Sequence, residues 1–181
     1  MPEASRDASL LIATSYQALK RAERGDKSTQ ITNCVVVILF AGFFIEENLN
    51  IILKEMRKSN EMASFLGKKY PGLLEKIAWY YNHWAAASKA STKKELFAKD
   101  TNDKLLILST LENRFPGIQE IYEFRNKVAH GEISRIANFE NAVRLRKQAK
   151  SIVNELFKIA AKANYDIPRN ITYNVAIITN E

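Results

Sequence analysis

Residues 34–45 read Cys34-Val35-Val36-Val37-Ile38-Leu39-Phe40-Ala41-Gly42-Phe43-Phe44-Ile45, the longest apolar run in the chain, and Glu46-Glu47 closes it. At about 12 residues the run is shorter than the ~20 that a membrane-spanning helix needs, so it predicts a buried core helix. We expect this helix to extend from about Ser28 to Lys58 and to span about 45 Å at 1.5 Å per residue. Its predicted inward stripe, at three- and four-residue spacing, is Val35, Ile38, Leu39, Gly42, Leu49, Leu53 and Met56. A helix of this length is expected to form the spine of a helical bundle.

Length and composition set broad limits on what the chain is. With 181 residues, of which 46% are hydrophobic, it is long enough for one domain with a substantial core. The net charge of +7 favours a polyanionic partner, because lysine and arginine neutralise phosphates. The single cysteine, Cys34, excludes an internal disulfide and a cysteine-based metal cluster. The polar first residues carry no recognisable leader, so a reducing cytoplasm and no membrane association are expected.

The remaining pattern predicts further helices and a short tail. A first helix is expected from Ser5 to Arg24, with Gly25 as the residue that ends it. Three more are predicted around residues 71–84, 104–114 and 117–130, and a long final helix follows Asn138, which is a good N-cap. Its buried side is predicted as Phe139, Ala142, Leu145, Ala149, Ile152, Leu156 and Ala160. The predicted fold class is therefore all-α, a four- to five-helix bundle over residues 1–165 with an extended tail over 166–181. Residues 171–178 are rich in β-branched residues and could form a strand. Because a single short strand is unstable alone, the tail is expected to be disordered, paired with a partner chain's copy, or laid over the bundle.

The stretch Arg125-Asn126-Lys127-Val128-Ala129-His130-Gly131 carries the chemistry that the sequence suggests. Arg125 projects from a helix face that is otherwise apolar, where a charge costs energy unless it is paired or faces a cleft or interface. The predicted partner of Arg125 is the carboxylate of Glu46, and Glu47 is the neighbour that could serve instead. RNA carries its own 2′-hydroxyl nucleophile, so a neutral histidine can act as base and an arginine can stabilise the phosphorane. The alternative reading is an exposed arginine and a helix-terminal histidine that binds the last carbonyls.

This stretch resembles the signature of the HEPN superfamily, Arg-x4-6-His, in which Asn, Asp or His often follows the arginine and Val-Ala-His-Gly is a common ending. The resemblance implies an HEPN-like helical bundle whose two motifs meet across a homodimer interface. It further implies Arg125 and His130 as the catalytic pair, with Asn126 orienting them. One departure is Glu132, where family members paired with a nucleotidyltransferase antitoxin often carry tyrosine, which puts regulation by that route in doubt.

The function predicted is a metal-independent endoribonuclease of HEPN type, a toxin or antiphage defence effector that cleaves single-stranded RNA. The alternative is a non-catalytic HEPN-like interaction or nucleotide-binding subunit of a larger system. Partners are expected to be RNA, a second copy of the chain and an antitoxin or defence-system protein; no cofactor and no metal ligand set is predicted. His83 is read as a packing residue, because no second ligand stands at metal-binding spacing. Basic residues expected to contact RNA are Lys127, Arg135, Arg144 and Lys147, although a basic face is most often simply solvated.

Overall fold

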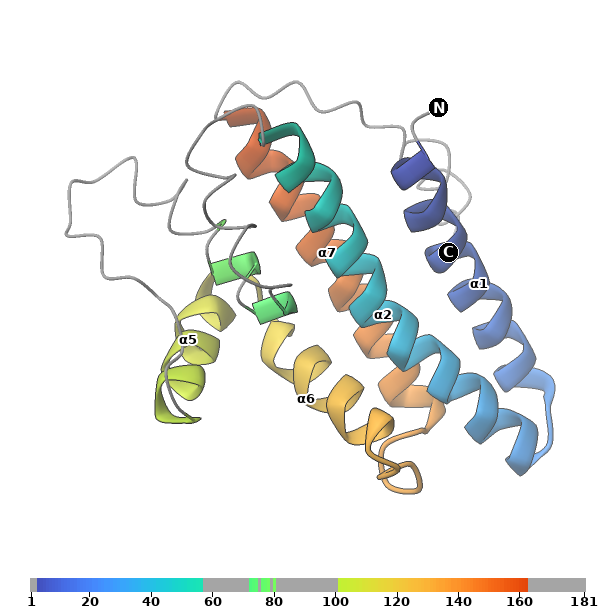
Figure 1. The fold of residues 1–181 in the computed structure, drawn as a ribbon. Helices are drawn as coiled ribbons and strands as arrows, with labels where there is room; N and C mark the ends of the chain where they lie inside the picture. The colour runs from blue at the N-terminus through green and yellow to red at the C-terminus, as the bar shows by residue number, and fades with distance from the viewer. Residues whose placement is uncertain (1–2, 57–71, 75, 79, 81–100, 163–181) are drawn as a thin grey trace.

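The computed structural model describes residues 3–56, 72–74, 76–78, 80 and 101–162. Every regular element within these ranges is an α-helix, which confirms the all-α fold class. The long elements are α1 (Glu3–Arg24), α2 (Lys27–Met56), α5 (Thr101–Arg114), α6 (Ile118–Ala129) and α7 (Phe139–Lys162). In Figure 1, α1, α2 and α7 lie side by side, and α6 and α5 lie on the other side of α2 and α7. The predictions for His83 and for the tail at 166–181 fall outside the described residues.

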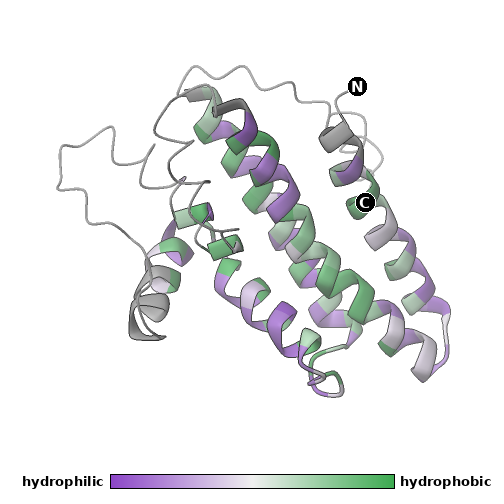
Figure 2. Cartoon of the chain, viewed as in Figure 1, coloured by the Kyte–Doolittle hydropathy of each residue, from purple (hydrophilic) through white to green (hydrophobic). Residues whose placement is uncertain are grey.

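Helix α2 is the spine that the apolar run predicts, because it packs against α1, α7 and α6. Its fully or nearly fully buried apolar residues are Cys34, Val37, Ile38, Ala41, Phe44, Ile45, Leu49, Ile52 and Leu53. Val35 and Leu39, predicted on the inward stripe, are only partly buried. Cys34, Val37 and Ala41, outside that stripe, are buried instead, because three neighbouring helices pack on α2 over more than one face. Figure 2 shows α2 as the most continuously apolar of the helices.

Helix α2 is also apolar enough to be compared with a membrane span. The segment Lys27–Lys54 has a mean hydropathy of 1.9 over its most apolar window, and half of that window is buried inside the bundle. Length and hydropathy alone would allow such a helix to cross a membrane, but the core helix of a soluble protein meets the same criteria. Its neighbours α1, α7 and α6 pack against it, and Phe43 on the same helix remains exposed.

The turn between α1 and α2 differs in detail from the prediction. Helix α1 ends at Arg24 as expected, but Gly25 does not adopt the left-handed conformation of a C′ glycine. The turn is fixed instead at the start of α2, where the Asp26 carboxylate accepts a hydrogen bond of 2.7 Å from the backbone N–H of Thr29. Asp26 therefore caps α2, which begins at Lys27 rather than at Ser28. This hydrogen bond holds the pKa of Asp26 below its ordinary value.

Helix α7 begins as the sequence predicts. The side-chain oxygen of Asn138 accepts a hydrogen bond of 2.8 Å from the backbone N–H of Asn141, which confirms the N-cap. All of the predicted inward residues are buried except Phe139, which is partly buried. Arg146 is buried as well, which the helical pattern does not predict. Its Nε donates to Ser15 Oγ at 3.3 Å, and its guanidinium lies over the Tyr16 ring. Arg146 therefore helps to join α7 to α1.

The described part of residues 72–80 is a short helical segment packed against the bundle. Leu73, Leu74, Ile77 and Ala78 are buried, and the buried Tyr80 hydroxyl donates a hydrogen bond of 2.6 Å to the carbonyl of Leu156 on α7. Burial of this hydroxyl raises its pKa well above the ordinary value. The Tyr80 hydrogen bond holds the segment against α7, and Lys76 reaches the same part of α2 that α6 approaches.

A carboxylate from α5 fixes the start of helix α6. Gly117 adopts a left-handed φ of 91°, and the Glu112 carboxylate accepts backbone hydrogen bonds from Gly117 (2.5 Å) and Gln119 (2.9 Å). A carboxylate at this position also interacts favourably with the helix dipole. Because the first turn is held in this way, the side chains further along α6 have defined directions toward α2.

Candidate functional site

The side chain of Arg125 crosses α2 at Gly42. A Cβ added at Gly42 would lie 2.7 Å from Arg125 Cδ, closer than real Cβ contacts, and 3.5 Å from both Cγ and Nε. Gly42 is buried in the middle of α2, where glycine lowers helix stability relative to alanine. The missing methyl group is therefore what allows the arginine to pass across the helix. The sequence places Gly42 on the inward stripe but gives no sign of this role.

Beyond Gly42, Arg125 reaches the carboxylate that the sequence predicts. Arg125 Nη2 lies 3.2 Å from Glu46 Oε2, and Lys76 Nζ lies 2.9 Å from Glu46 Oε1. Each carboxylate oxygen thus holds one cation, and the two cations come from different elements. The predicted pairing of Glu46 with Arg125 is present, whereas Glu47 instead accepts a hydrogen bond of 3.3 Å from Asn50.

This group of three charges is partly shielded from solvent. The side chains of Arg125 and Glu46 are each 22% exposed and that of Lys76 is 13% exposed. Pairs at this depth gain more from Coulomb attraction than fully exposed pairs do, because less water screens them. Two cations and one carboxylate leave one net positive charge. Sequence reasoning missed Lys76, because only the packing of the 72–80 segment brings it to α2.

An aromatic ring completes the surroundings of Arg125. The guanidinium carbon lies 4.8 Å from the centroid of the Phe43 ring, within the range of a cation–π interaction. Phe43 is 37% exposed, one of two large hydrophobic side chains exposed to this degree in the described part of the chain. Its ring also lies 6.3 Å from that of Phe40. The arginine is therefore held between a carboxylate and an aromatic ring, with one side open to solvent.

His130 lies at the other end of the motif, where α6 stops. The backbone N–H of Glu132 donates to the carbonyl of Lys127 (2.9 Å) and that of Gly131 to Val128 (3.1 Å), with Gly131 at a left-handed φ of 87°. These two hydrogen bonds form a Schellman motif, so Gly131 ends the helix as predicted. His130 is the C-cap residue, and its backbone N–H donates to the carbonyls of Asn126 and Lys127.

The imidazole of His130 is exposed, and within the described ranges it has no hydrogen-bond partner. Because α6 remains regular up to Ala129, a five-residue offset still places the two side chains about 140° apart around the axis. Asn126 is partly buried between them along the helix. One chain therefore presents the arginine and the histidine on different sides of α6 and does not bring them together.

The basic residues expected to contact RNA divide into two groups. Lys127, Arg135 and Lys147 are exposed, and the Lys127 ammonium lies 6.0 Å from the Phe124 ring. Arg144 instead forms two hydrogen bonds with the Glu120 carboxylate, of 2.5 Å and 3.2 Å. The bond from Arg144 holds the pKa of Glu120 below its ordinary value, and a bond from Gln148 acts in the same direction. Arg144 is thus engaged within the chain, in contrast to the other three.

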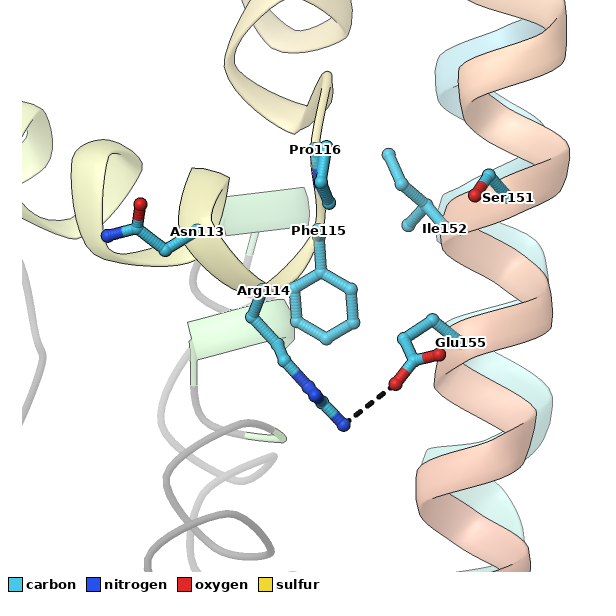
Figure 3. Close-up of a pocket in the computed structure, with 7 residues that line it drawn as sticks. All are labelled: Asn113, Arg114, Phe115, Pro116, Ser151, Ile152 and Glu155. Atoms are coloured by element: carbon cyan, nitrogen blue, oxygen red, sulfur yellow. Dashed lines mark ion pairs between the residues drawn. The ribbon is translucent and has the colours of Figure 1, made fainter.

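The described residues also form hollows away from the motif. A groove of about 270 Å³ between the α5–α6 turn and α7 is lined by Phe115, Pro116, Ile152 and polar neighbours (Figure 3). Its two charged residues, Arg114 and Glu155, pair with each other at 2.7 Å. None of the motif residues lines it. Over the described ranges no group of histidine, cysteine, aspartate and glutamate is arranged to hold a metal ion.

Comparison of the chain with family models, with curated proteins and with solved structures gives no match. The resemblance to the HEPN superfamily accordingly rests on the motif residues alone.

Proposed function

We propose that this protein is a metal-independent endoribonuclease of HEPN type that cleaves single-stranded RNA and acts as a toxin or antiphage defence effector in the cytoplasm. The observation that carries the proposal is the placement of Arg125. The partly buried side chain of Arg125 crosses α2 at Gly42 and is held by the Glu46 carboxylate. Its Nε and Nη1 have no partner among the described residues. A cation that is fixed in direction but has donors to spare suits the binding of a phosphate.

In the proposed reaction, His130 removes the proton from the 2′-hydroxyl, whose oxygen then attacks the adjacent phosphorus. The P–O5′ bond breaks, the 5′-oxygen takes up a proton from water, the His130 imidazolium returns its proton to solvent, and the products are a 2′,3′-cyclic phosphate and a 5′-hydroxyl. Arg125 stabilises the negative charge that grows on the phosphorane oxygens. Because Arg125 and His130 of one chain diverge around α6, we propose that the working site combines the motifs of two chains in a homodimer.

The test is cleavage of a single-stranded RNA in the presence of EDTA. The wild-type protein should cut it and leave cyclic phosphate or 3′-phosphate ends and 5′-hydroxyl ends. His130→Ala should lower the rate by roughly 10²–10⁴, the usual share of a general base. Its fold, followed by circular dichroism, should not change, because the imidazole is exposed. Activity that disappears on chelation and returns with magnesium would refute the mechanism.

A second function is favoured by one specific observation. The guanidinium of Arg125 already bonds to Glu46, so the pair can serve simply to hold α6 against α2. In that case the protein is a non-catalytic HEPN-like subunit that binds a nucleotide or a partner protein. Absence of RNA cleavage by the wild type, together with wild-type complex formation by His130→Ala, would support this second function.

A further inference from the structure

The charges around Glu46 contain a cation that the motif does not include. Lys76 comes from the 72–80 segment, is the least exposed of the three charged side chains, and bonds to the Glu46 oxygen that Arg125 does not use. The carboxylate therefore bridges two cations and holds them on the same part of α2. A phosphodiester also presents two non-bridging oxygens, so two cations held in this way suit its recognition.

Charge balance points in the same direction. Arg125 paired with Glu46 alone would be neutral and would attract a phosphate weakly. With Lys76 the group carries one net positive charge, in a partly shielded position where a charge acts more strongly than at an exposed site. The exposed Phe43 ring lies next to Arg125 and lends an aromatic face to this group.

We infer that Lys76 and Arg125, bridged by Glu46, form one subsite for a backbone phosphate of single-stranded RNA, and that Lys76 contacts the phosphate itself. This inference rests on the proposed function for the identity of its ligand. Lys76 remains hydrogen-bonded to Glu46 through one proton, and the ammonium group has two further protons to donate. Glu46 acts as a positioning residue, because it fixes both cations without contacting the phosphate.

The test measures binding rather than cleavage, with a 2′-O-methyl RNA oligonucleotide that cannot be cut. Lys76→Met keeps most of the apolar stem and removes the charge, and Lys20→Met on α1 is the matched control with the same change in net charge. We expect Lys76→Met to weaken binding roughly tenfold and to reduce the slope of log affinity against log salt by about 0.7, the share of one phosphate contact on a single strand. Lys20→Met should change neither value to this extent, and Lys76→Arg should restore most of the affinity.

A Glu46→Gln background separates direct contact from simple charge compensation. If Lys76 contacts the phosphate, Lys76→Met should weaken binding in this background too. If Lys76 only neutralises Glu46, the same change should have no effect once the carboxylate is gone, and that result overturns the inference. A wild-type protein that does not bind the oligonucleotide also overturns it. Binding that depends on Lys76, without cleavage of unmodified RNA, would refute the proposed ribonuclease and leave the phosphate subsite standing.

Discussion

Replacing Gly42 with alanine is the sharpest perturbation of this structure, because one methyl group should displace Arg125 while leaving the bundle folded. The added Cβ would lie 2.7 Å from Arg125 Cδ, in the middle of the side chain rather than at its flexible end. The arginine must therefore move away from α2. Gly72, where an added Cβ meets nothing within 4 Å, is the matched control for the same substitution.

The expected change in stability is small because two effects oppose each other. Alanine in place of glycine inside a helix should stabilise α2 by about 1 kcal/mol. Displacing Arg125 should lose its hydrogen bond to Glu46 and its contact with Phe43, which together are worth about 1 kcal/mol at a partly exposed site. The free energy of unfolding of Gly42→Ala should thus stay within about 1 kcal/mol of the wild-type value. In an Arg125→Ala background the clash no longer exists, so the same substitution should stabilise the protein by about 1 kcal/mol.

The assays are urea unfolding followed by circular dichroism and RNA cleavage in EDTA. A shift of about 1 Å in a reacting group can cost roughly 10²-fold in rate, so Gly42→Ala should lose about that much activity with little loss of stability. Gly72→Ala should retain wild-type activity. The reasoning is refuted if Gly42→Ala stabilises the wild type as much as it stabilises Arg125→Ala and leaves the rate unchanged. The unfolding data remain decisive for the geometry even if no cleavage is found.

Two further predictions concern assembly and pH. Mixing Arg125→Ala subunits with His130→Ala subunits should produce activity that neither variant has alone, because a mixed dimer retains one intact pair in trans; a strictly monomeric protein that still cleaves RNA would contradict the shared site. Because Arg144 lowers the folded-state pKa of Glu120 beneath its ordinary value of 4.5, its contribution to stability should be present above that pH and be lost as the pH falls through the lower folded-state pKa. The wild-type protein should therefore have a higher urea midpoint than Glu120→Gln at about pH 7, and this difference should shrink by about pH 2. A difference that is the same at both pH values would argue against this pair.

Local sequence pattern predicts the parts of the fold that depend on neighbouring residues. The apolar run around residues 34–45 predicts the spine, Asn138 predicts the start of α7, and Gly131 predicts the end of α6, and each of these predictions is confirmed. Caps and apolar stripes are decided within one or two turns of helix, so the sequence alone contains the information. The role expected of Gly25 is wrong because the Asp26 cap on the following helix already fixes that turn.

The candidate site could be predicted only where a charged residue on an apolar face required a partner of opposite charge. Arg125 lies on an apolar face and Glu46 on the inward side of α2, so the energetic cost of leaving either unpaired makes their contact foreseeable. Lys76, Arg146 and the pair between Arg144 and Glu120 are different, because each depends on how separate elements pack. No local pattern indicates which surface lysine lies against a carboxylate 30 residues earlier.

The relative placement of Arg125 and His130 constrains any mechanism that uses both. The Schellman motif fixes the backbone at His130, so the Cα–Cβ bond of the histidine cannot be redirected toward α2 without breaking the hydrogen bonds of Glu132 and Gly131. The side chain of Arg125 is held against Gly42 of α2 by its ion pair with Glu46. Neither side chain is free to approach the other within one chain at low cost. A reaction that needs both must therefore take its histidine from a second copy, or it must use the arginine and its own histidine on different parts of one bound RNA. The mixed dimer separates these two possibilities, because only the first regains activity when the two variants are combined.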